Sequence, residues 1–119
     1  MIRFEVSKSE GHYTGFVCEG HAEYDEEGMD IVCSAVSALT VNMVNSVEAL
    51  TDDGYAVEHP EDGGYLKLEL TGVPSDRTVL LMDSLILGMK NILEAYGEEY
   101  ISISIPQEPE EITETSEEV

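Results

Sequence analysis

The 119-residue sequence has no tryptophan, only two cysteines and only five lysines and arginines. Those five cations face 26 aspartates and glutamates, which gives a formal net charge of −21 at pH 7. A chain this acidic repels nucleic-acid phosphates and anionic lipids, so we expect no direct binding to nucleic acid or to membranes. The same charge attracts basic partners, although a surface that serves only solubility would explain it equally well.

Long apolar runs and export signals are also missing. No stretch approaches the roughly 20 apolar residues that a membrane span needs. Residues 1–6 alternate apolar and charged side chains, unlike the apolar core of a signal peptide. We therefore expect a cytoplasmic protein, in which a disulfide between Cys18 and Cys33 is not expected.

The pattern of apolar residues predicts seven elements in one domain, residues 1–105. Alternation with period two predicts strands at 2–7, 13–21, 55–59, 65–71 and 98–105. Spacings of three and four predict helices over 30–50 and 75–96, the second capped by Ser75. The order ββαββαβ predicts an α+β fold with two helices packed on a mainly antiparallel or mixed sheet.

The C-terminal residues and the second predicted helix lead to predictions about disorder and about oligomeric state. Residues 106–119 are predicted to be a disordered acidic tail, because 107–119 hold six glutamates and almost no apolar residue. The helix over 75–96 has more apolar faces than one small sheet can cover, so we expect it to contact a second subunit in a homodimer.

Cys33 and His21 are the candidate nucleophile and general base. Cys33 falls in the first turn of the predicted helix, where the helix dipole and the unpaired amides favour thiolate, and where the amides of Cys33 and Ser34 could form an oxyanion hole. His21 ends the preceding strand and could take the thiol proton. Cys18 lies in mid-strand and is expected to be an inert core residue.

Other residues around this pair keep two interpretations each. Asp30 either caps the helix or orients His21 as the third member of a triad. Ser37 lies one turn after Cys33, either as a polar residue on a packed face or as a substrate contact. The acidic loop with Asp25, Glu26, Glu27 and Gly28 would raise the Cys33 pKa at short range, or act mainly on a basic substrate if it is solvated.

We expect no metal and no cofactor. The three histidines and two cysteines lack the spacing of a zinc site, and no glycine-rich loop precedes a helix. His12 in a predicted turn and His59 beside Pro60 are expected to be exposed.

The residues Gly20-His21-Ala22, then Gly28, then Asp30-Ile31-Val32-Cys33-Ser34-Ala35-Val36-Ser37 resemble the signature of the bacterial ribosomal-processing cysteine protease family, Prp. The resemblance extends through the order of elements to about Ile105 and leaves out the tail. Ser34 stands where the family commonly has alanine.

This resemblance implies a small homodimeric cytosolic protease that removes a short N-terminal extension from protein twenty-seven of the large ribosomal subunit. It implies Cys33 as nucleophile and His21 as general base, and it places Asp30 and Ser37 in the same site. Residues 23–29 would correspond to the family's mobile loop. The family's substrate extension ends in an aromatic residue followed by a small one, just before a basic mature N-terminus.

Two other functions fit the same residues. A non-catalytic acidic binding module or chaperone for a basic ribosomal protein would need no thiol, and so would survive Cys33→Ser. A redox sensor would need an accessible sulfenic acid at Cys33 but no dependence on His21.

Overall fold

The computed structural model describes residues 1–20, 27–61 and 63–106, and within 27–30 only the backbone. The chain order is β1 (Ile2–Ser9), β2 (His12–Glu19), α1 (Glu27–Leu50), β3 (Tyr55–Glu58), β4 (Tyr65–Leu70), α2 (Asp76–Tyr96) and β5 (Ile101–Ser104). The predicted order ββαββαβ is therefore confirmed. The strands β2, β3, β4 and β5 are shorter than predicted, because the apolar alternation continues into flanking residues that lie beyond the paired registers of the sheet.

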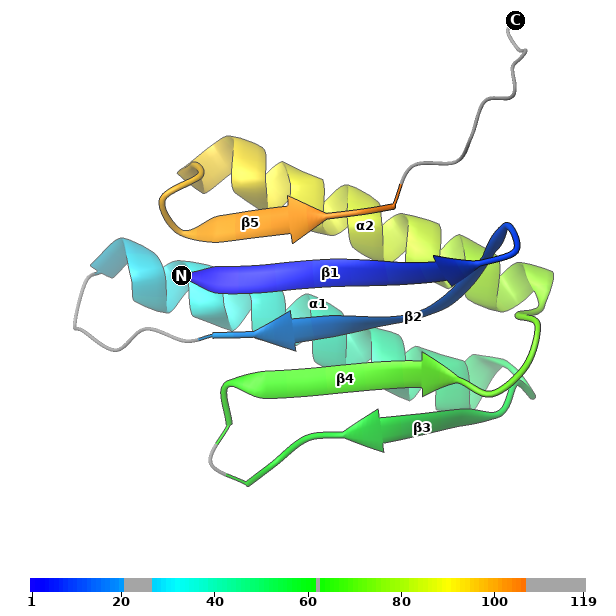
Figure 1. Ribbon diagram of the computed structural model, residues 1–119. Helices are drawn as coiled ribbons and strands as arrows, with labels where there is room; N and C mark the ends of the chain where they lie inside the picture. Colours follow the sequence, from blue (N-terminus) through cyan, green and yellow to red (C-terminus); the bar gives the residue numbers. More distant parts are fainter. Residues whose placement is uncertain (21–26, 62, 107–119) are drawn as a thin grey trace, which may run out of the picture.

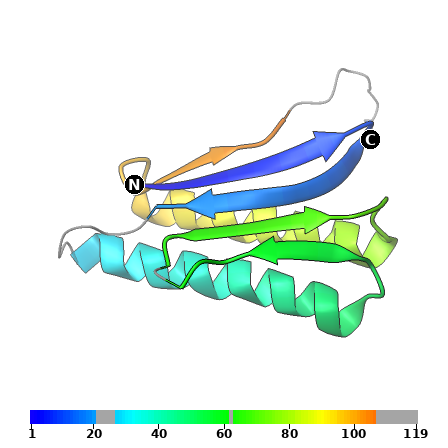
Figure 2. The same cartoon turned by 60° about the horizontal axis from the view of Figure 1, so that its bottom comes forward.

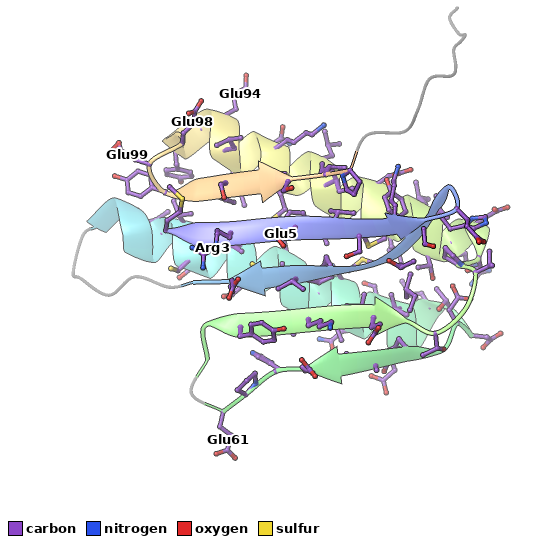
Figure 3. All side chains as sticks on the ribbon, viewed as in Figure 1. Arg3, Glu5, Glu61, Glu94, Glu98 and Glu99 are labelled. Carbon is purple, nitrogen blue, oxygen red and sulfur yellow. The ribbon has the colours of Figure 1, made fainter. Side chains whose placement is uncertain are left out.

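One mixed sheet of five strands carries the fold, in the order β3-β4-β2-β1-β5. Only β1 and β5 run parallel, and the other pairs are antiparallel. Both helices cover the same face of this sheet (Figures 1 and 2). The opposite face is polar, and Arg3 and Glu5 project from it into solvent (Figure 3).

The core lies between the sheet and the helices. Alternate strand residues such as Phe4, Cys18 and Leu66 share one row across β1, β2 and β4 and are buried. The helices pack closely against each other at Gly88, where an added Cβ would lie 2.8 Å from a methyl carbon of Leu39. The apolar helix stripes that meet the strands are Val32, Val36, Met43 and Val47 on α1, and Met82, Leu85, Ile86, Met89 and Ile92 on α2.

The start of α2 confirms the predicted cap. Ser75 is the N-cap, and its hydroxyl accepts a hydrogen bond from the Thr78 amide. The Asp53 carboxylate accepts hydrogen bonds from the amide and the hydroxyl of Ser75, at 2.9 and 3.0 Å. The Thr78 hydroxyl chiefly, then the two Ser75 groups, lower the pKa of Asp53. The buried Thr78 hydroxyl forms no hydrogen bond of good geometry with the described residues, so it lowers the pKa of Asp53 because it lies close to that carboxylate.

The start of α1 differs from the prediction. The helix begins at Glu27, three residues before Asp30, so the interpretation of Asp30 as the N-cap is wrong. A capping residue marks a helix start only when the residues before it are not helical. Here the helix extends back to Glu27, and an acidic residue in the first turn suits the helix dipole. Cys33 therefore lies in the second turn and not in the first.

The stretch Ile31–Leu50 of α1 corrects another expectation. By length and composition it is long and apolar enough to cross a membrane, contrary to the prediction that no stretch approaches this. The core helix of a soluble protein passes the same test. In this fold the stripe from Val32 to Val47 packs on the sheet and on α2.

Candidate active site

Gly20 directs the chain out of the sheet at the edge where the candidate residues gather. Its φ is +109°, and an added Cβ would lie 2.2 Å from the Met1 carbonyl oxygen. Its amide donates a hydrogen bond to the Gly64 carbonyl, at 2.8 Å. Only glycine tolerates both this backbone conformation and this close approach. The position before His21 is thus set by the ends of β1, β2 and β4 together.

A cavity of about 100 Å³ opens at this edge, between α1 and the sheet. Its floor is apolar and includes Ile2, Cys18 and Leu66, which come from β1, β2 and β4. Its other walls come from the α1 residues Cys33, Val36, Ser37, Thr40 and Val41 and from the loop residues Gly20, His59 and Gly64, with Tyr65 at the start of β4.

Cys33 is a free, half-buried thiol on the helix wall of this cavity. It is the seventh residue of α1, so its amide and that of Ser34 lie inside the helical hydrogen-bond ladder. The unpaired amides of a helix belong to its first turn, and the dipole effect also fades beyond that turn. The prediction that these two amides form the oxyanion hole is therefore wrong.

Cys18 is a free thiol in the core, as predicted. Burial, and to a lesser extent the charges of Cys33 and Glu19, raise the pKa of Cys18 to about 12. Cys18 and Cys33 line the same cavity, so the two thiols lie near each other. At neutral pH Cys18 is protonated and so a poor nucleophile.

Ser37 and Thr40 follow Cys33 along the same wall. Ser37 is exposed and lines the cavity, which favours its interpretation as a substrate contact over that of a packed polar residue. Thr40 is buried, and its hydroxyl donates to the Val36 carbonyl at 2.9 Å, so it is satisfied by the helix itself.

His59 is a cavity residue that the sequence interpretation missed. It is exposed, as predicted, but it lies on the same cavity as Cys33, 26 positions away in sequence. No local motif links the two residues. Only the pairing of β3 with β4, and the bond from Gly20 to Gly64, bring the loop after β3 to this edge.

The remaining predicted site residues fall where less is described. His21, Asp25 and Glu26 lie outside the described residues, and so does the tail from residue 107. Glu27, Gly28 and Asp30 belong to the first turn of α1, whose side chains also lie outside them. Among the described side chains, no three His, Cys, Asp or Glu come together as a metal site would require.

Comparison with known proteins matches this arrangement to one family. The model of the family described as cysteine protease Prp matches residues 1–102. The ribosomal processing cysteine protease Prp of Bacillus subtilis is 32% identical over 103 residues, which cover 81% of this chain and 90% of that protein.

Solved structures agree in fold. The crystal structure of the ribosomal processing protease Prp of Staphylococcus aureus with a covalently linked product peptide has a TM-score of 0.78 at 27% identity, covering 89% of this chain and all of that one. A Streptococcus mutans protein has a TM-score of 0.78 at 34% identity, covering 88% of this chain and 93% of that one. The residues that match the family model run from β1 into β5, and we conclude that this chain belongs to the cysteine protease Prp family.

Proposed function

We propose that this protein is a cytoplasmic cysteine endopeptidase that removes a short N-terminal extension from a basic protein of the large ribosomal subunit, protein twenty-seven. One observation carries the proposal: a free, half-buried thiol, Cys33, lines a cavity of about 100 Å³ in a member of a cysteine protease family. The relative from Staphylococcus aureus, solved with a covalently linked product peptide, supports covalent chemistry. Both described cysteines are free, which fits a reducing compartment.

The chemistry follows from the two residues of the proposed dyad. His21 takes the proton of the Cys33 thiol, and the thiolate attacks the scissile carbonyl carbon. The tetrahedral intermediate collapses as the carbon–nitrogen bond breaks, and His21 returns the proton to the leaving amine. Water, activated by the same imidazole, then hydrolyses the thioester and restores the thiol.

Four other groups have supporting roles in this proposal. Asp30, which does not cap the helix, is left with the role of orienting His21. Ser37 contacts substrate in the cavity. Asp25 and Glu26, together with Glu27 and Gly28 at the start of α1, bind the basic segment after the cleaved bond. The net charge of −21 supports a basic protein substrate and disfavours direct contact with nucleic acid or an anionic membrane.

A homodimer is part of the proposal. Leu80 and Leu87 lie two turns apart on α2 and are 69% and 62% exposed. On α1 no charged residue occurs from Ile31 to Val47, and Ile31 and Val41 are exposed apolar residues. Two copies of so acidic a chain repel each other over most of their surface, so they approach best where charge is missing.

Cleavage and binding by Cys33 variants test the function. The substrate is a peptide with an aromatic residue before the scissile bond, a small residue after it and lysines beyond. We expect Cys33→Ala and Cys33→Ser to bind this peptide and not to cut it, while Cys18→Ala still cuts. Binding without cleavage by the wild-type protein would favour the acidic chaperone instead.

A further inference from the structure

The cavity beside Cys33 has two chemically different parts. The floor is made of core side chains, with Ile2, Cys18 and Leu66 all buried. The mouth is polar, with Ser37 on the helix side and His59 on the loop side. A volume of about 100 Å³ suits one apolar side chain of a bound peptide. The main chain of that peptide must then pass across the polar mouth.

Backbone hydrogen bonds and a proline constrain the described residues next to His59. Pro60 follows it and restricts the His59 backbone to extended conformations. The Gly63 amide donates to the Pro60 carbonyl at 3.1 Å, and the Gly20 amide donates to the Gly64 carbonyl at 2.8 Å. These bonds anchor the loop to itself and to the end of β2. Glu61 of the same loop points away into solvent (Figure 3).

The His59 imidazole is available for a ligand. The side chain is exposed, and within residues 1–20, 31–61 and 63–106 no hydrogen bond or ion pair engages it. Neutral and protonated imidazole both carry at least one N–H donor. An N–H donor at the mouth of an apolar cavity matches what an extended peptide presents there, a main-chain carbonyl.

We propose that His59 is a substrate-binding residue of this site, whose imidazole N–H donates a hydrogen bond to a main-chain carbonyl of the peptide seated in the cavity. This rests on the proposed function and adds a residue to it. The role differs from that of His21, because a bond made equally in bound substrate and transition state lowers KM and leaves kcat unchanged.

Three variants test the proposal with the fluorescent form of the peptide used above. His59→Ala removes the donor, and His59→Gln keeps an N–H donor on a side chain of similar reach. His12→Ala is the matched control, since His12 is also exposed but starts β2 at the opposite end of the strand from Gly20. Dissociation constants are measured by anisotropy in a Cys33→Ser background, and kcat and KM in the active enzyme. Circular dichroism checks that each variant folds.

The expected result is a Kd and a KM raised about fivefold to tenfold by His59→Ala, the effect of one lost hydrogen bond. We expect kcat to stay within about twofold, His59→Gln to restore most of the affinity, and His12→Ala to change neither constant. An unaltered Kd in His59→Ala would overturn the inference. The inference would also be overturned if His59→Gln bound the peptide no better than His59→Ala, or if His59→Ala lowered kcat strongly at constant KM. If the wild-type protein binds but does not cut, while Kd still depends on His59, the proposed function fails and the assignment of His59 stands.

Discussion

The two cysteines should differ sharply in reactivity, although they lie near each other. Burial raises the pKa of Cys18 to about 12, whereas Cys33 is half-buried on the cavity wall. At pH 8, a thiol with this pKa is ionised in about one molecule in 10⁴, against roughly one in four for an ordinary thiol with a pKa near 8.5. Cys18 should therefore react on the order of a thousandfold more slowly than an exposed thiol, before its limited access is counted.

Alkylation followed by mass spectrometry measures this difference. Iodoacetamide at pH 8 should modify Cys33 first, and cleavage activity should be lost in step with that modification. Cys18→Ala should leave the labelling of Cys33 and its link to activity unchanged. Cys33→Ala should leave a protein that takes up almost no label until it is unfolded.

The same pKa predicts an alkaline dependence of stability. The folded-state pKa of Cys18 lies above its value of 9.0 in the unfolded chain. Its contribution to the free energy of unfolding is thus complete below pH 9 and is lost as the pH rises toward 12. At pH 10 the loss is about 1 kcal/mol. Urea midpoints of wild-type protein should fall more steeply between pH 8 and 10 than those of Cys18→Ala.

Two results would refute this reasoning. Equal labelling of both cysteines in the folded protein would mean that Cys18 is neither buried nor protonated as described. Loss of cleavage in a folded Cys18→Ala variant, with Cys33→Ala still active, would make Cys18 the nucleophile.

Four further predictions concern the base, the bend, the cap and the dimer. His21→Ala should lower the cleavage rate on the order of 100-fold with the fold retained, and full activity with an unchanged pH–rate profile would remove it from the mechanism. Gly20→Ala should lower the free energy of unfolding in urea by more than about 2 kcal/mol, since its Cβ would overlap backbone; a wild-type midpoint would show that the bend can relax. Asp53→Ala should cost about 2 kcal/mol at pH 7 for two lost hydrogen bonds to a partly exposed carboxylate. Because the folded pKa of Asp53 is lowered, that difference should shrink as the pH falls below about 4, and a pH-independent difference would exclude the charge as its cause. Leu80→Glu combined with Leu87→Glu should give monomers in sedimentation at micromolar concentration, and an unaffected dimer would place the interface elsewhere.

The local features of this protein were determined by its sequence. Alternation of apolar residues specifies β1, the three-to-four spacing specifies α2, and Ser75 caps α2 in the way its neighbours predict. Cys18 could be placed in the core because it shares a strand face with Phe16. Such features depend on residues within a few positions of each other, so periodicity and side-chain chemistry suffice to find them.

The start of α1 was decided by more than local pattern. Asp30 has the chemistry of a cap, but the helix continues back to Glu27, and this moves Cys33 from the first turn to the second. A capping residue indicates only that a helix can begin at that position. Whether it does depends on the path of the chain that enters the helix.

The composition of the cavity was decided by the tertiary structure alone. Cys33 belongs to α1, whereas His59 and Gly64 belong to the loop between β3 and β4, and no sequence spacing relates the helix to this loop. They meet because β3 pairs with β4, because Glu19 pairs with Tyr65 in the register of β2 and β4, which brings Gly20 and Gly64 within one hydrogen bond, and because α1 crosses that edge. Strand register and helix packing are sums of many distant contacts, so the position of His59 follows only from the assembled fold.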